Sequence, residues 1–140
     1  METYNHRAWA EVDLEVIANN IKEIRRFTSK KARIMAVVKA DAYGHGYLEV
    51  SKTLLKNGAD TLGVAVLEEG IQLREHGINC PIIVLGATNP VLCEDLVNYS
   101  IIPSVFNEEL PKALSESATR LGKCAKIHIK VDTGMNRVGF

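Results

Sequence analysis

The chain has 140 residues, of which 46% are hydrophobic, so it is long enough and apolar enough to form a domain with a real core. Its 17 basic and 17 acidic side chains balance, which argues against nucleic acid or an anionic membrane surface as a partner. No stretch approaches the roughly 18 apolar residues of a membrane span, and the first seven residues lack the apolar core of a secretory signal.

The three cysteines, Cys80, Cys93 and Cys124, are widely spaced and stand in apolar surroundings. They form neither a CxxC motif nor a cluster with the spacing of metal ligands. We therefore expect small core residues of a cytoplasmic protein, and no metal site.

The first half of the chain predicts strands and helices in alternation. Trp9–Asp13 alternates apolar and polar residues as a short strand does, and Asp13 can cap a helix whose apolar residues recur at helical spacing from Leu14 to Ile24. Arg33–Lys39 is the first clear buried strand. A helix beginning at Tyr47 and closed by Asn57 and Gly58 follows, and Thr61–Val66 is the next strand.

The second half repeats this unit. Glutamates in the first turn and basic residues in the last predict a helix over Leu67–His76. We expect further strands at Pro81–Leu85, Ile101–Val105 and Lys126–Asp132, the second of them short or irregular because it contains Pro103. The helices between them run from Asn89 and Pro90 through Tyr99, and from Glu108 to Leu121 with Asn107 as the cap.

Strands and helices that alternate about every 20–28 residues predict an α/β fold with a parallel sheet and right-handed crossovers. Both a doubly wound open sheet and part of a (β/α)₈ barrel fit this order. The first strand–helix loop has no G-x-G-x-x-G, so a dinucleotide fold is not favoured. Lys126–Asp132 places polar side chains on one face, as a barrel interior that holds a site would require, but an edge strand of an open sheet would alternate in the same way.

The chain is organised around Ala36–Gly46, which reads Ala-Val-Val-Lys-Ala-Asp-Ala-Tyr-Gly-His-Gly. A buried strand here delivers Lys39 to the carboxyl end of the sheet, where a partly desolvated amine can act as a nucleophile. Taken alone, a lysine here is more often a surface residue at a strand end. We expect His45 to form hydrogen bonds within the loop and Asp41 to brace it.

A second loop shares these features. Lys130–Phe140, which reads Lys-Val-Asp-Thr-Gly-Met-Asn-Arg-Val-Gly-Phe, takes another strand into a glycine-containing loop that carries Arg137. The loops after the strands build the active site of an α/β barrel, so Lys39, Tyr43, Lys130 and Arg137 could converge there.

Together the two motifs, with Trp-Ala-Glu-Val-Asp-Leu near the start, resemble the alanine racemases over the whole chain. The resemblance implies a fold that is the N-terminal part of a pyridoxal-phosphate-binding TIM-type (β/α)₈ barrel, with about five of eight strands in residues 1–140. It implies that a cytoplasmic, homodimeric enzyme interconverts L-alanine and D-alanine by two-base proton transfer through an aldimine of pyridoxal 5′-phosphate. It also implies that the D-alanine is used to make peptidoglycan.

The resemblance also implies individual roles. Lys39 matches the lysine that anchors the cofactor and then acts as the base on the D-alanine side. Tyr43 matches the tyrosine that contacts the cofactor phosphate. Arg137 matches the arginine near the cofactor's phenolic oxygen and the substrate carboxylate, which a guanidinium fork suits. Lys130 matches a lysine that is carbamylated in several members, and the unmodified amine is the alternative.

In the family, the second base, most phosphate ligands, the rest of the barrel and a C-terminal β-domain lie beyond the position of Phe140. We therefore expect residues 1–140 alone to have little activity and to associate through open strand edges. Two alternatives remain: a racemase of another small amino acid, since a methyl-sized pocket discriminates weakly, and a non-catalytic module that binds pyridoxal phosphate or self-associates.

Overall fold

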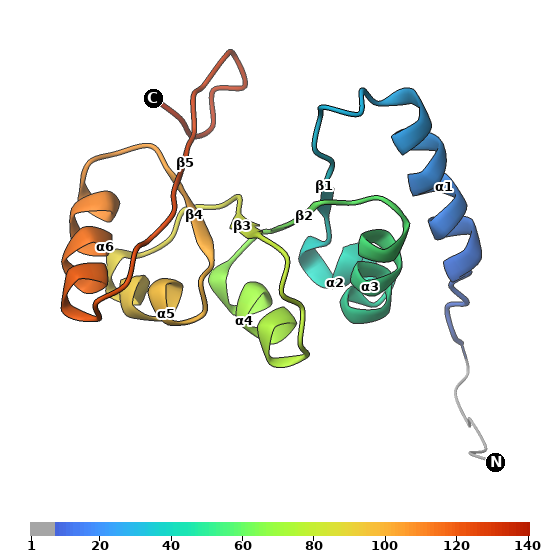
Figure 1. The fold of residues 1–140 in the computed structure, drawn as a ribbon, viewed down its shortest axis with the longest axis horizontal. Coiled ribbons are helices and arrows are strands. Elements are labelled where there is room, and N and C mark those ends of the chain that lie inside the picture. Colours follow the sequence, from blue (N-terminus) through green and yellow to red (C-terminus); the bar gives the residue numbers. More distant parts are fainter. Residues whose placement is uncertain (1–7) are drawn as a thin grey trace.

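The computed structural model describes residues 8–140, which form a five-stranded parallel sheet with helices along one side (Figure 1). Its strands are β1 (Met35–Val37), β2 (Thr61–Val64), β3 (Ile82–Val84), β4 (Ile102–Val105) and β5 (His128–Ile129). Its helical elements are α1 (Leu14–Phe27), α2 (Lys39–Gly44), α3 (Tyr47–Asn57), α4 (Leu67–Glu75), η1 (Pro90–Leu92), α5 (Cys93–Asn98) and α6 (Glu109–Arg120).

The strands lie in the sheet in chain order, β1-β2-β3-β4-β5, and each pairs in parallel with the next. A doubly wound sheet would reverse its order at a switch point, whereas successive strands of a barrel add one after another. The observed order therefore favours the barrel, of which these strands are consecutive members. Among residues 8–140, no helix is long and apolar enough to cross a membrane.

Side-chain oxygens of Asp13 and Asn107, the two caps expected for α1 and α6, accept hydrogen bonds from the first turns of these helices. Asp13 Oδ1 accepts hydrogen bonds from the backbone N–H groups of Glu15 (2.8 Å) and Val16 (3.1 Å) at the start of α1. Asn107 Oδ1 accepts from Leu110 N–H (3.3 Å) at the start of α6. These bonds satisfy amide groups that have no partner within the helix.

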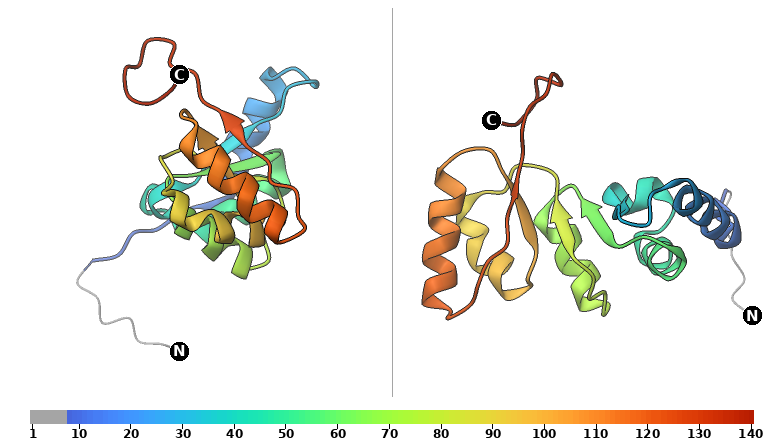
Figure 2. Two further views of the ribbon diagram at one scale, coloured as in Figure 1. Left: turned by 90° about the vertical axis from the view of Figure 1, so that its left-hand side faces the viewer. Right: turned by 45° about the horizontal axis from the view of Figure 1, so that its top comes forward.

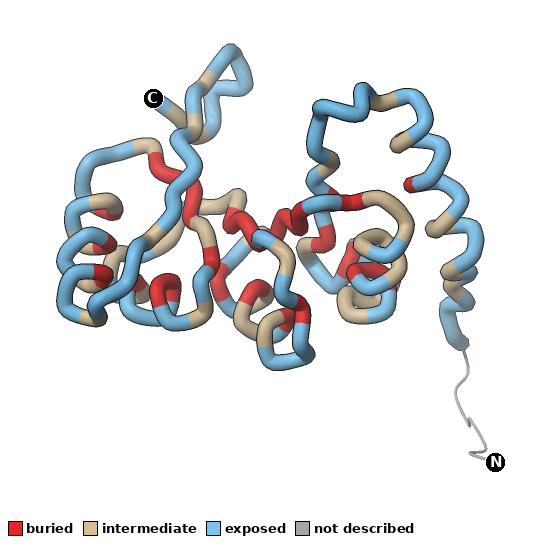
Figure 3. The backbone as a smooth tube through the Cα atoms, viewed as in Figure 1, coloured by how far each residue is buried: buried red, intermediate tan, exposed pale blue. Residues whose placement is uncertain are grey.

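The core lies between the sheet and its helices (Figure 3). The middle strands are buried on both faces, and Leu62, Val64, Ile82 and Val84 have no exposed surface. The edge strand β1 buries only Ala36, while Met35 and Val37 on its other face are 36% and 38% exposed. The expected burial of the strand over Arg33–Lys39 is therefore found on one face and is wrong for the other, because no element of residues 8–140 covers that second face.

Two other predictions of regular structure need correction. Residues 8–13 form no strand, since no neighbouring strand pairs with them, and Trp9 is 81% exposed. The strand expected over Lys126–Asp132 shortens to the two residues of β5, which has a partner on only one side. The helix expected from Pro90 to Tyr99 instead begins as the 3₁₀ turn η1 and continues as α5.

The cysteines are all free, but only some belong to the core. Cys93 is buried and Cys80 is half-buried, and in both cases burial raises the pKa of the thiol. Cys124 lies exposed in the connection after α6, so its assignment to the core is wrong.

Candidate active site

Lys39 lies directly beyond the carboxyl end of β1. The strand ends at Val37, and Val38 N–H still donates to Gly63 O on β2 (2.9 Å). Lys39 then opens the six-residue element α2, so it belongs to the turn rather than to the strand as predicted. Its side chain is half-buried, and Nζ makes no hydrogen bond or ion pair within residues 8–140.

The turn that follows Lys39 is left-handed. Ala40, Asp41, Ala42 and Tyr43 have φ of 50°, 55°, 52° and 57°, and none of them is glycine. For L-residues this conformation costs roughly 1–2 kcal/mol each, so four in succession cost roughly 4–8 kcal/mol. A strained turn of this kind persists only where surrounding contacts hold it, and strained residues cluster at functional sites.

Hydrogen bonds between neighbouring residues hold the end of this turn that lies away from Lys39. Asp41 Oδ1 accepts from Tyr47 N–H (2.8 Å), and Asp41 O accepts from Gly46 N–H (3.0 Å). His45 Nδ1 lies 2.9 Å from Ala42 O, and a carbonyl can only accept, so the ring donates. These contacts confirm Asp41 as a brace and His45 as a hydrogen-bonding group of the loop.

Glu69 of α4 holds the near side, which the sequence does not predict. Its Oε1 accepts from Ala40 N–H (2.7 Å), and its Oε2 accepts from Ala65 N–H (2.7 Å), beyond the end of β2. The sequence indicates only a favourable charge in the first turn of a helix. No local pattern connects residue 69 with residue 40, because the contact depends on the pairing of β1 with β2.

Tyr43 stands beside Lys39. The Lys39 ammonium lies 5.9 Å from the centroid of the Tyr43 ring, within the range of a cation–π contact. Tyr43 is 61% exposed, so the pair faces open space rather than the core. The two residues are four apart in the sequence, and the left-handed turn brings them together.

The second candidate loop leaves β5 and stands away from the rest of the fold (Figure 2). Main-chain bonds close it: Phe140 N–H donates to Lys130 O (2.9 Å), and Asp132 N–H donates to Phe140 O (3.0 Å). Asp132 Oδ1 accepts from the N–H groups of Gly134 (2.9 Å) and Asn136 (3.1 Å), and these bonds lower the pKa of the carboxyl group. Arg137 is exposed on this loop, and Lys130 is half-buried at its base.

The two loops follow the same ends of parallel strands, but β1 and β5 form opposite edges of the sheet. Within residues 8–140, no hydrogen bond or ion pair joins Lys39 or Tyr43 to Lys130 or Arg137. Lys39 and Tyr43 thus form one group, and Lys130 and Arg137 share another. The contact between the groups stays a prediction.

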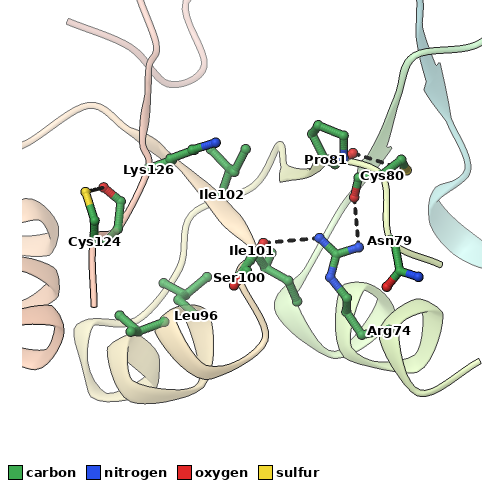
Figure 4. Close-up of a pocket in the computed structure, with 12 residues that line it drawn as sticks. Arg74, Asn79, Cys80, Pro81, Leu96, Ser100, Ile101, Ile102, Cys124 and Lys126 are labelled. Atoms are coloured by element: carbon green, nitrogen blue, oxygen red, sulfur yellow. Dashed lines mark hydrogen bonds between the residues drawn. The ribbon is translucent and has the colours of Figure 1, made fainter. Parts of the chain in front are cut away.

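A separate cavity of about 250 Å³ lies at the opposite end of the strands (Figure 4). Its wall includes Arg74, whose guanidinium donates to the carbonyl oxygens of Tyr99 (2.9 Å), Cys80 (2.8 Å), Ser100 (3.1 Å) and Ile78. These carbonyls belong to the connections that precede β3 and β4. Arg74 therefore ties the amino ends of the strands together and leaves little donor capacity for a ligand.

Comparison with known proteins agrees with the fold and the motifs. Residues 12–140 match the family model described as alanine racemase, N-terminal domain. An alanine racemase of Methanococcus maripaludis is 52% identical over 136 residues, which cover 97% of this chain and 36% of the relative.

Solved structures give the same result. An alanine racemase of Bacillus anthracis, crystallised with bound L-Ala-P, is 37% identical with a TM-score of 0.91 over 99% of this chain and 36% of that one. A histidine racemase of Leuconostoc mesenteroides is 35% identical with a TM-score of 0.88, again over 99% of this chain and 37% of that one. The chain spans about a third of the length of these relatives. By its sequence and its fold, the chain belongs to the pyridoxal-phosphate-dependent alanine racemase family.

Proposed function

We propose that the protein is an alanine racemase that interconverts L-alanine and D-alanine, and that residues 1–140 are the N-terminal part of its cofactor-binding barrel. The observation that carries this proposal is the position of Lys39. It lies at the carboxyl end of β1, beside Tyr43 and next to a left-handed turn held by hydrogen bonds, and its Nζ makes no hydrogen bond or ion pair within residues 8–140.

The donor set fits pyridoxal phosphate. When bound, this cofactor supplies an aldehyde for a primary amine and an electron-withdrawing ring that acidifies the α-carbon of an amino acid. Lys39 offers that amine, which no described residue holds in an ion pair, and Tyr43 offers a phenol hydroxyl to a phosphate oxygen. Arg137 offers a guanidinium fork that suits a carboxylate.

In this proposal, Lys39 Nζ would also hold and move the proton on the D-alanine side of the α-carbon. The opposing proton belongs to a second base, which we assign to the partner subunit of a homodimer. We infer that Lys130 pairs with Arg137 if its amine is carbamylated, since that changes a cation into an anion. The roles of Lys39, Lys130 and Arg137 follow from their motifs and from the chemistry of their side chains, and the second base is inferred from the family resemblance.

A racemase of another amino acid is the second candidate. The histidine racemase of Leuconostoc mesenteroides matches this chain almost as well as the Bacillus anthracis alanine racemase does, with TM-scores of 0.88 and 0.91. The fold of this region is therefore compatible with a small and with a large substrate side chain.

Solvent deuterium exchange tests the proposal. The full-length protein with pyridoxal phosphate is incubated in D₂O with each enantiomer of alanine and of histidine, and deuterium at the α-carbon is measured by NMR. We expect exchange and chiral inversion of alanine, both lost in Lys39→Ala. Faster exchange of histidine would favour the second candidate. Cofactor bound at Lys39 with no exchange of any substrate would indicate a non-catalytic binding module.

A further inference from the structure

We infer that Glu69 is a positioning residue for Lys39, because its carboxylate fixes the left-handed turn that carries the lysine. This inference deepens the function proposed above and rests on it for the role of Lys39. Among residues 8–140, Glu69 makes no hydrogen bond or ion pair with the side chain of Lys39, Tyr43, Lys130 or Arg137, and its bonds go to backbone N–H groups, so we assign it an effect through the backbone.

The first step of the argument is the place where Glu69 binds. Oε1 accepts from the N–H of Ala40, the residue that follows Lys39 and begins the left-handed backbone. A carboxylate bond to a backbone N–H is charge-assisted and stronger than a neutral one. Ala40 is exposed, so in the absence of Glu69 water would take its N–H and the turn would lose a restraint on this side.

The second step is that Glu69 is itself fixed. It stands in the first turn of α4, whose neighbouring residues Leu67, Gly70 and Leu73 are buried against the sheet. Gly70 lies so close to the core that an added Cβ would come within 2.9 Å of Ile101 Cδ1. A carboxylate on such a helix has little freedom to follow a moving loop, so it restrains the loop instead.

The third step is that Glu69 connects two loops. Oε2 accepts from Ala65 N–H (2.7 Å) and, more weakly, from Val66 N–H (3.4 Å). Ala65 O in turn accepts from Gly86 N–H (3.1 Å), where an added Cβ would approach that oxygen to 2.5 Å. One carboxylate thus links the turn after β1 to the tightly packed loops after β2 and β3.

The space beside Glu69 explains why this restraint is needed. A cavity of about 210 Å³ lies between the turn and α4, lined by Val38, Asp41, Tyr47, Val64, Glu69, Gln72 and Leu73. Few side chains therefore pack behind the turn, and hydrogen bonds keep it in place. Asp41 holds the far end through Tyr47 N–H, and Glu69 holds the end next to Lys39.

Amide hydrogen exchange at single-residue resolution, on the full-length protein without cofactor, tests the contact directly. In Glu69→Ala we expect the amides of Ala40 and Ala65 to exchange at least about tenfold faster. Glu69→Gln keeps the size of the side chain but has one acceptor oxygen, so only one of these two amides should stay protected. Glu68→Ala, which changes the exposed neighbour, should alter neither.

The amide of Leu62, which donates to Pro81 O (3.0 Å) in the core, serves as the internal reference. Unchanged exchange at Ala40 in Glu69→Ala would overturn the inference. Equal acceleration at Leu62 would also overturn it, because Glu69 would then support the whole fold rather than the turn. If Glu69→Ala does not fold, Glu69→Gln provides the test, because unchanged protection of both the Ala40 and Ala65 amides in that variant would overturn the inference.

A second readout links the turn to Lys39. At limiting pyridoxal phosphate, borohydride reduction should label Lys39 about tenfold less in Glu69→Ala than in the parent or in Glu68→Ala. Equal labelling in all three would contradict the positioning role. Absence of label at Lys39 in the parent would instead contradict the proposed function, and the exchange data would still decide whether Glu69 holds the turn.

Discussion

Substitution of Ala40 probes the left-handed turn with little interference from packing, because its side chain is exposed. Its backbone has φ of 50° and ψ of 55°. Glycine adopts this conformation without the penalty of roughly 1–2 kcal/mol that an L-residue incurs. Glycine also loses about 0.5–1 kcal/mol more conformational entropy on folding. Ala40→Gly should therefore stabilise the turn by roughly 0.5–1 kcal/mol, whereas a β-branched residue should destabilise it, and we expect Ala40→Val to cost about 1–2 kcal/mol.

The assay is the exchange rate of the Gly46 amide, whose bond to Asp41 O (3.0 Å) breaks when the turn opens. Because 1.4 kcal/mol corresponds to a tenfold change, Ala40→Gly should slow this exchange about two- to fivefold and Ala40→Val should speed it about five- to thirtyfold. The matched control is Ala18→Gly in the right-handed helix α1, where glycine should destabilise its own helix by about 1 kcal/mol. Faster exchange of Gly46 in Ala40→Gly would refute the left-handed conformation as the source of strain.

Three further predictions concern the second loop, the hydrogen bonds of Arg74 and the core. Because the folded state lowers the pKa of Asp132 below its ordinary value of 3.8, its bonds stabilise the loop above that pH and weaken as the pH falls through the lowered value. NMR of the loop amides should show this loss in an acid titration, and loop bonds that weaken at a pH above 3.8 would contradict it. Arg74→Met should destabilise the protein by about 2–4 kcal/mol in urea titrations, since several carbonyls lose a charged donor, whereas Arg26→Met, 68% exposed, should change stability by less than about 0.5 kcal/mol. Leu62→Ala should cost about 2.5–5 kcal/mol in the same assay, while a similar effect from Val91→Ala, 78% exposed, would show that burial is not the cause.

Most of the fold could be predicted because its signals are local. Asp13 caps α1 as predicted, and Asn107 accepts a hydrogen bond from the first turn of α6, although Glu108 is the N-cap residue. Each predicted strand after Lys31 has a counterpart within its predicted range. The order of the sheet could not be predicted, because the pattern of Lys126–Asp132 fits an edge strand and a barrel strand alike. The strand predicted at Trp9–Asp13 does not form, and the reason is similar: alternation shows which residues share a face but not whether a partner strand exists.

The candidate site was predictable to the extent that it is continuous in sequence. Lys39 and Tyr43 belong to one motif, and they lie together. The left-handed conformation of the turn was not predictable, since alanine and aspartate at residues 40–42 have no strong preference for it. Glu69 was missed for a different reason: its partner amide lies 29 residues away, and only the pairing of β1 with β2 brings the two together.

The central claim is that Lys39 binds pyridoxal phosphate covalently, and one measurement tests it most directly. The full-length protein is mixed with pyridoxal phosphate, reduced with borohydride and digested, and the labelled peptide is identified by mass spectrometry. Lys39→Ala and Lys130→Ala provide a matched pair, because both lysines are half-buried and follow strands of the same sheet. We expect the label on Lys39 in the parent and in Lys130→Ala, and none in Lys39→Ala. A label on Lys130 that survives in Lys39→Ala, or no specific label in the parent, would contradict the claim.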